Sequence, residues 1–182
     1  PVRTTYTFGF GIFSKGRQKK RLAARFKDQV VDLYALADAG FFDDLQIKKS
    51  VFRQDFLNDF ISLGKAKTNA VRARLGELFT QSDERLGTFL YPENAVKLHL
   101  PVRIGDYTDF YSSEQHAYNV GVMFRDPNNA LLPNWKHLPV AYHGRASSIF
   151  VSGTNFHRPK GQINASDETL PIFAASKRVD IE

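Results

Sequence analysis

The chain has 182 residues, of which 42% are hydrophobic and 24% charged, an ordinary globular composition with room for one large or two small domains. It contains no cysteine, which excludes disulfides, thiolate nucleophiles and cysteine-bound zinc. The net charge of +6 allows a polyanionic partner, but the basic stretches 15–27 and 65–74 lack interleaved aromatic residues that would stack on bases. We therefore expect solvated surface there, and no nucleic-acid partner.

The first third of the chain predicts a small, strongly curved antiparallel sheet. Aromatic residues alternate with small ones over residues 4–13, a strand pattern in which glycines allow a bulge or a close approach. Residues 14–16 read as a turn. Two short apolar runs, 22–26 and 29–33, are separated by two polar residues and predict a hairpin.

Helical patterns follow. Residues 34–40 predict a short helix closed by glycine, and residues 55–79 predict an amphipathic helix that Gly64 can interrupt. The apolar stripe of this longer helix should cover the sheet. Residues 81–94 are polar and contain a proline, which indicates a loop.

The character of the chain changes after Pro101. Residues 96–100 predict a last strand of a first domain, 1–101, and residues 102–182 form a second domain that is rich in histidine, tyrosine and glycine. In this second part we predict strands at 149–152 and 179–181, and a loop at 161–170. No apolar run is long enough to span a membrane, and no secretory leader is visible, so we expect a cytoplasmic protein with no membrane partner.

Residues 105–125 concentrate the polar chemistry of the chain. Ser112 and Gln115 have the spacing of a capping box, which predicts a helix that begins there. Asp109 and Tyr111 then lie just before the helix, and His116 lies about one turn inside it. A segment that only builds a core would not need so many polar groups.

Each of these side chains allows two interpretations. Asp109 can hold a hard divalent cation or cap a turn, and His116 can be a general base, a ligand or a hydrogen-bonded core residue. If the helix ends at Gly121, Arg125 stands in a loop and can bind a carboxylate in bidentate fashion or form a surface ion pair. Tyr142 can offer its hydroxyl to a substrate oxygen or fill the mouth of a barrel.

The sequences DYTDFYSSEQHAYNVGVMFRD, NALLPNW, LPVAYHGRASSIFVSGT and RPKGQ closely resemble the fumarylacetoacetase family, and GIFS and VVDL extend the resemblance into the first half. The resemblance implies a mostly β fold with some α: an SH3-like small barrel plus helix, then the first part of a mixed β-roll. It implies hydrolysis of a carbon–carbon bond in a diketo acid during tyrosine breakdown, and a homodimer when the protein is complete.

The resemblance also assigns roles to single residues. It implies a Ca²⁺ or Mg²⁺ ion bound by Asp109 and Glu182, and His116 as the group that activates the attacking water. Tyr111, Arg125 and Tyr142 correspond to groups that hold the oxygens and carboxylate of the substrate. The metal would polarise the carbonyl under attack, and the metal and cationic groups would stabilise the departing enolate.

Further family ligands and the groups that stabilise the carbanion correspond to positions after Glu182. We therefore predict that these 182 residues are inactive, or nearly so, by themselves, and that the β-roll has an exposed edge. The alternatives are a non-enzymatic, truncated folding module, a chain that works only by association with the missing part, and a related hydrolase or decarboxylase with another acylpyruvate substrate.

Overall fold

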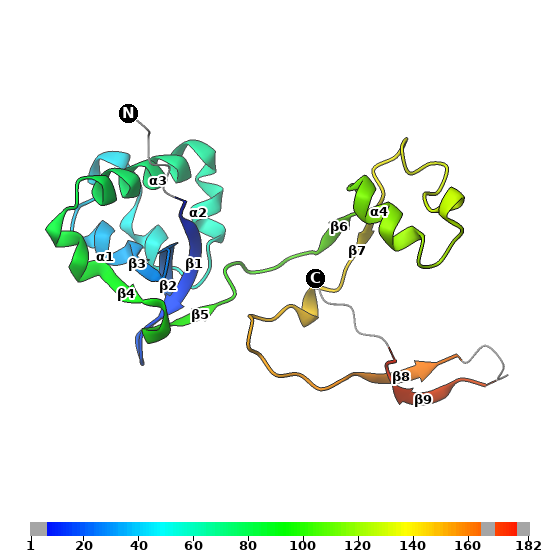
Figure 1. Cartoon of the computed structure of the whole chain (residues 1–182). Coiled ribbons are helices and arrows are strands. Elements are labelled where there is room, and N and C mark those ends of the chain that lie inside the picture. Colours follow the sequence, from blue (N-terminus) through cyan, green and yellow to red (C-terminus); the bar gives the residue numbers. More distant parts are fainter. Residues whose placement is uncertain (1–6, 165–169, 178–182) are drawn as a thin grey trace. The chain divides into compact units, whose positions relative to one another are not determined.

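The computed structural model describes residues 7–164 and 170–177. By its internal contacts the chain divides after Ile149 into two compact units, each of which is described by itself. The first unit contains all helices and strands from β1 to β7, and the second contains β8 and β9 (Figure 1). The domain boundary after Pro101 stays a prediction.

The fold is mixed α/β, with more helix than the mostly β fold we expected. Short 3-10 turns connect many of the elements. The helices and strands are β1 (Gly9–Ser14), β2 (Arg21–Phe26), β3 (Gln29–Asp32), α1 (Leu33–Asp38), α2 (Asn58–Ser62), α3 (Gly64–Thr80), β4 (Leu90–Pro92), β5 (Lys97–His99), β6 (Thr108–Phe110), α4 (Glu114–Gly121), β7 (Ala141–His143), β8 (Lys160–Ile163) and β9 (Ile172–Ala175).

A curled, antiparallel five-stranded sheet forms a half-barrel in the first unit, with strand order β4-β3-β2-β1-β5. The predicted hairpin is confirmed as β2 and β3, which pair from Ala23↔Asp32 to Phe26↔Gln29. Its tight turn has no glycine, and Lys27 adopts a φ of 55° instead. The strand predicted at 4–13 is observed as β1, which begins at Gly9; residues 7 and 8 precede it, and residues 1–6 lie outside the described part.

The predicted amphipathic helix is two helices, α2 and α3. It begins at Asn58 rather than at residue 55, and Gly64, with a φ of +80°, separates the two parts as its position suggested. The apolar stripe of α3 is buried in one cluster with the sheet and α1; its buried residues are Val71, Leu75 and Leu78. No helix in residues 7–164 or 170–177 is long and apolar enough to cross a membrane.

Three other predictions were wrong. Residues 81–94 contain the edge strand β4, which tolerates Pro92 because its outer side needs no amide donor. Residues 149–152 lead into a turn, in which the Thr154 amide donates to the Val151 carbonyl at 3.3 Å. The predicted loop at 161–170 begins instead with β8, which pairs with β9. The strand predicted at 179–181 lies outside the described residues.

A buried acid joins the sheet to α1. Asp32 is fully buried, and its Oδ1 accepts from the Ala35 amide at 3.0 Å, which caps the helix. Its Oδ2 lies 2.9 Å from Arg21 Nη2. Burial raises the pKa of Asp32, and the helix amide and the Arg21 charge act in the opposite direction. Arg21 is therefore the counter-charge that an ionised Asp32 would need in the core.

Candidate functional site

Two short antiparallel strands, β6 and β7, carry the first predicted site residues. Asp109 lies directly opposite Tyr142 in the ladder, between the pairs Thr108↔His143 and Phe110↔Ala141. Side chains of directly opposite residues project from the same face of a sheet. The predicted metal ligand and one predicted substrate-binding tyrosine are therefore neighbours.

A glycine permits the close approach of these two strands at their end. The Gly144 amide donates to the Tyr107 carbonyl at 2.8 Å, which extends the pairing by one residue. A Cβ at this glycine would lie 1.7 Å from Cδ1 of the Tyr107 ring. Any other residue at position 144 would therefore displace the ring or separate the strands.

Helix α4 presents His116 in its first turn. Its N-cap is Ser113, whose Oγ accepts from the His116 amide at 3.4 Å, so the cap predicted at Ser112 was wrong by one residue. The sequence offers two adjacent serines, and the backbone at Ser113 has the extended dihedrals of a cap, with φ −85° and ψ 117°. His116 is consequently nearer the helix start than expected, and it is exposed.

Tyr111 connects the strand end to the helix. Its hydroxyl donates to the Ala117 carbonyl at 3.0 Å, and its ring meets the His116 ring edge-on, with centroids 5.6 Å apart and planes at 76°. Asp109 and Tyr142 thus form one pair on β6 and β7, and Tyr111 and His116 form a second pair, just after β6 and in the first turn of α4.

Arg125 lies at the other end of α4. The helix ends at Gly121 as expected, and the extended Asp126 precedes Pro127 as expected. Nη1 of Arg125 donates to the Ala130 carbonyl at 2.8 Å. A Cβ at Gly121 would lie 2.2 Å from that same carbonyl oxygen, so the loop is folded tightly against the helix. The guanidinium of Arg125 is therefore held by its own loop.

The described residues do not by themselves fit a calcium or magnesium ion. Within residues 7–164 and 170–177, no three histidine, aspartate or glutamate side chains are grouped as metal ligands. Glu182 lies outside that part of the chain, and Asp109 alone is far short of the roughly six oxygens that either ion needs.

Sequence reasoning missed Trp135. Its indole Nε1 donates to the Tyr111 carbonyl at 2.8 Å, and its own amide donates to Leu132 in a turn. The one available signal was that this is the sole tryptophan of the chain, placed within the same polar region. A half-buried tryptophan usually finds a partner for its N–H, but its spacing gives no hint of which.

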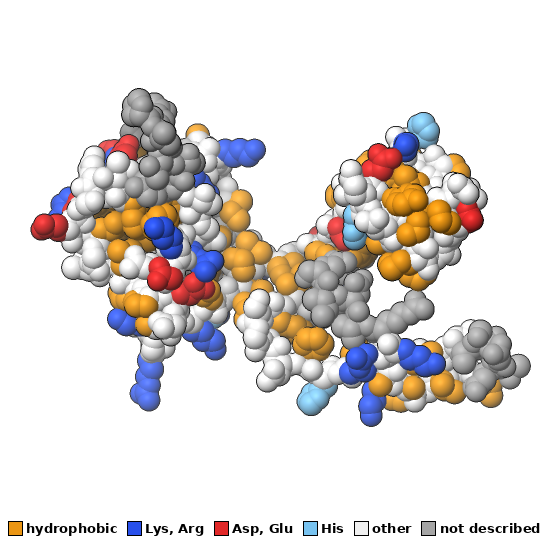
Figure 2. All heavy atoms as spheres, viewed as in Figure 1, with side chains coloured by type: hydrophobic (Ala, Val, Ile, Leu, Met, Phe, Trp, Pro, Cys, Tyr) orange, Lys and Arg blue, Asp and Glu red, His pale blue; other side chains and the backbone are white. Residues whose placement is uncertain are grey.

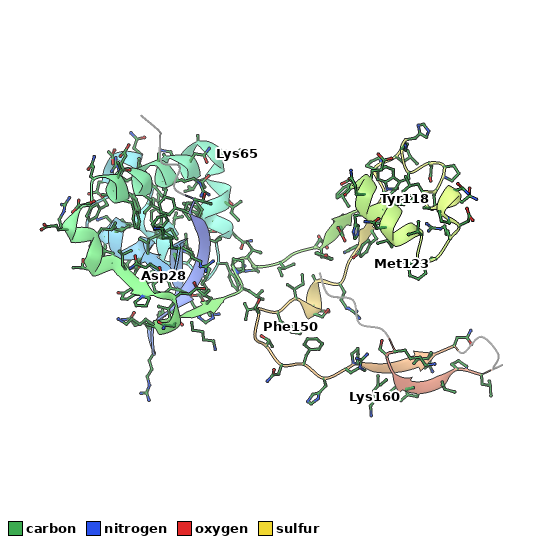
Figure 3. All side chains as sticks on the ribbon, in the orientation of Figure 1. Asp28, Lys65, Tyr118, Met123, Phe150 and Lys160 are labelled. Atoms are coloured by element: carbon green, nitrogen blue, oxygen red, sulfur yellow. The ribbon has the colours of Figure 1, made fainter. Side chains whose placement is uncertain are left out.

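Large apolar side chains surround this region and stay exposed. Figure 2 shows apolar atoms gathered over α4 and the turns that follow, and Figure 3 labels Tyr118 and Met123 among them. Met123 is 67% exposed. Those between residues 105 and 149 are Phe110, Tyr118, Met123, Phe124, Leu132, Leu138, Val140 and Tyr142.

The residues that form the small curled sheet and its helical cover match a known protein family. The family model "Fumarylacetoacetase N-terminal" matches residues 8–101, just over half of the chain, and the chain belongs to this family.

Whole relatives extend the match beyond that domain. The chain is 44% identical over 182 residues to fumarylacetoacetase of Homo sapiens and 45% identical over 181 residues to that of Rattus norvegicus. The enzyme of Caenorhabditis elegans is 44% identical over 183 residues. In each case the match covers 95% of this chain and 43% of the relative. The chain is a homologue of the N-terminal portion of fumarylacetoacetase and spans less than half the length of these relatives.

Proposed function

We propose that this chain forms the N-terminal part of an enzyme that hydrolyses 4-fumarylacetoacetate to fumarate and acetoacetate in the cytoplasm. The observation that carries the proposal is the pairing of Asp109 with Tyr142 across β6 and β7, and of Tyr111, just after β6, with His116 in the first turn of α4. The 44% identity to a fumarylacetoacetase over nearly the whole chain supports the substrate class.

In this proposal His116 takes a proton from water as the water oxygen bonds to the carbonyl carbon of the fumaroyl group. The adjacent carbon–carbon bond then breaks, and the departing enolate takes up a proton to give acetoacetate. An exposed imidazole in the first turn of a capped helix is accessible to water and held by its backbone. Both features suit a general base.

The tyrosines have different tasks in this scheme. A diketo acid offers mainly acceptor oxygens, and a phenol has a single donor hydrogen. Tyr111 already donates to the Ala117 carbonyl, so it can donate to the substrate only by giving up that bond. We assign Tyr142 a contact with a substrate oxygen because its backbone lies directly opposite Asp109. Arg125 is proposed to bind the substrate carboxylate after leaving the Ala130 carbonyl.

The site needs residues beyond those described. A Ca²⁺ or Mg²⁺ ion at Asp109 would require additional oxygen ligands, of which Glu182 is one candidate. We propose that the remaining ligands lie in a further part of the protein. That part would correspond to the portion of the relatives that this chain does not span, which is more than half of their length. By themselves the 182 residues should then be inactive.

The finer fold and the assembly are part of the same proposal. We infer that the five-stranded sheet is an SH3-like small barrel, which its antiparallel order and short strands support. The strand pairs β6–β7 and β8–β9 would begin a mixed β-roll. The complete protein is proposed to be a homodimer, and light scattering on the completed chain would measure this directly.

A hybrid protein tests the function. Residues 1–182 are fused to the portion of the human relative that follows the aligned region, and disappearance of 4-fumarylacetoacetate is followed by absorbance. We expect hydrolysis by the hybrid, none by the 182 residues alone, and a loss of about 10²- to 10⁴-fold with His116→Asn. Lys136→Met is the control, because its ion pair with Glu114 at 3.1 Å is exposed on both sides. A folded hybrid without activity, or an unaffected His116→Asn variant, would contradict the proposal.

A further inference from the structure

Both backbone polar groups of Tyr111 are bound by one segment, residues 135–140. The Tyr111 amide donates to the Val140 carbonyl at 2.8 Å, and its carbonyl accepts from Trp135 Nε1 at 2.8 Å. Tyr111 stands just after β6 and two residues before the cap of α4. These two bonds therefore fix the point where the strand turns into the helix.

The side chain of Tyr111 transmits this restraint to His116. The hydroxyl donates to the Ala117 carbonyl, which restrains the phenol ring. The ring meets the imidazole edge-on, at 5.6 Å between centroids. The imidazole is otherwise exposed, so loss of this contact would free its side-chain torsions.

Trp135 is itself well held. Its amide donates to the Leu132 carbonyl at 2.9 Å, and the following turn is closed by the His137 amide on the Asn134 carbonyl at 3.0 Å. Its side chain is partly buried, unlike the exposed side chains on either side of it. A residue that positions a catalytic side chain must itself be held rigidly, and Trp135 meets this requirement.

We propose that Trp135 is a positioning residue for His116: its indole N–H fixes the Tyr111 carbonyl, and the Tyr111 ring then sets the orientation of the imidazole. The contacts stand independently of the reaction, but their catalytic meaning rests on the proposed function. Trp135 would thus act through Tyr111, without contacting the attacking water or the substrate.

Nuclear magnetic resonance on the 182-residue chain tests the contacts without any activity. The parent should show a nuclear Overhauser effect between the Tyr111 and His116 rings. Trp135→Phe keeps a ring but removes the donor, and we expect it to weaken that effect and shift the His116 ring resonances. Lys136→Met changes the adjacent residue and its exposed link to α4, and it should leave both signals unchanged.

A second variant covers the case in which phenylalanine disturbs the loop. Because Trp135 is the only tryptophan, biosynthetic replacement of tryptophan by 3-benzothienylalanine alters this position alone. The analogue keeps the bicyclic shape and replaces N–H with sulfur. It should reproduce the loss of the ring–ring effect. Unchanged His116 ring resonances and an unchanged Tyr111–His116 effect in this analogue would overturn the inference. The absence of that effect in the parent would also overturn it.

Kinetics on the hybrid separate the two proposals. A misplaced base should lower kcat about tenfold or more and change KM little, because a shift of about 1 Å can cost that much. Lys136→Met should leave both constants unchanged. If the ring contact is present and the hybrid is inactive, the proposed reaction fails and the positioning contact stands. An active hybrid whose kcat is unaffected by Trp135→Phe would refute the positioning role.

Discussion

Residues 7–101 and residues 105–149 are stabilised in different ways. Every large apolar side chain that is fully buried in the described chain lies before residue 90. From 105 to 149 the buried residues are Ala117, Gly121 and Ala130. There the chain is fixed by single hydrogen bonds, such as those of Trp135, Tyr111 and Arg125.

The two parts therefore differ in their ability to fold by their own packing. Burial of apolar area is the main driving force of folding, and a hydrogen bond contributes only about 1 kcal/mol net. The first part has a continuous core, whereas the second exposes the side chains that would build one. We therefore expect the site-bearing part to open locally long before the first part unfolds.

The largest effect is expected from removing an aromatic ring from the core of residues 7–101. Phe52 is fully buried and packs between Phe42 and Phe60. Phe52→Ala should lower the free energy of unfolding by about 3–5 kcal/mol. Met123→Ala, at an exposed site, should change it by less than about 0.5 kcal/mol. Urea denaturation followed by circular dichroism measures both, and comparable losses would mean that the second part shares the core.

The buried ion pair gives a large, pH-dependent effect within the first part. Arg21→Ala leaves Asp32 buried without its counter-charge, which should cost about 3 kcal/mol at neutral pH. Burial already raises the pKa of Asp32, and loss of Arg21 raises it further. A raised pKa favours the folded state at low pH, so the cost should shrink as the pH falls through that raised value.

The exposed pair of Arg25 and Glu93, at 2.8 Å, provides the control. Arg25→Ala should cost less than about 1 kcal/mol. The free energy of unfolding is measured from denaturation curves at pH 7 and pH 5. If Arg21→Ala lowers it by the same amount at both, this would argue against an ionised buried Asp32.

A smaller and local effect is expected at the end of α4. Gly121→Ala would place a methyl group 2.2 Å from the Ala130 carbonyl oxygen and force the loop away from the helix. Overpacking of this kind costs about 1–3 kcal/mol, which should speed exchange of the Ala117 amide roughly 5- to 150-fold. Gly105→Ala should leave the exchange of the Ala117 amide unchanged, because the space around a Cβ at that position is open. Equal exchange in both variants would show that this loop is not packed as described.

The smallest effect lies on the surface of the first part. Arg74 holds Asp44 through two hydrogen bonds, at 3.0 and 2.6 Å, and these bonds lower the pKa of Asp44. A lowered pKa gives stability that is present above the ordinary value and is lost as the pH falls through the lowered one. Asp44→Asn should therefore be slightly less stable than the parent at neutral pH, with the gap closing in acid. A gap that does not vary with pH would contradict this.

The sequence predicted the parts that follow from local periodicity. The hairpin, the stripe of Val71, Leu75 and Leu78, and the helix end at Gly121 were all confirmed. Strand β4 was missed because it is short, pairs with a strand far away in the sequence and contains a proline that is tolerated only at a sheet edge. Strands β8 and β9 were missed because they are short.

The site was predictable as a set of residue types on one stretch of chain. The Asp109↔Tyr142 pairing joins residues from two strands, and only the fold determines that register. The Trp135–Tyr111 bond runs from a side chain to a backbone oxygen, for which the sequence carries no pattern. The roles of Asp109, Glu182, His116, Arg125 and the two tyrosines remain predictions.

The single tryptophan has a practical consequence. Trp135 lies in the part with little core, and none lies among residues 7–101. Fluorescence excited at wavelengths that tyrosine does not absorb will therefore report only the site-bearing part. If the emission changes before the far-ultraviolet dichroism is lost, a single sample reports the opening of the site separately from the unfolding of residues 7–101.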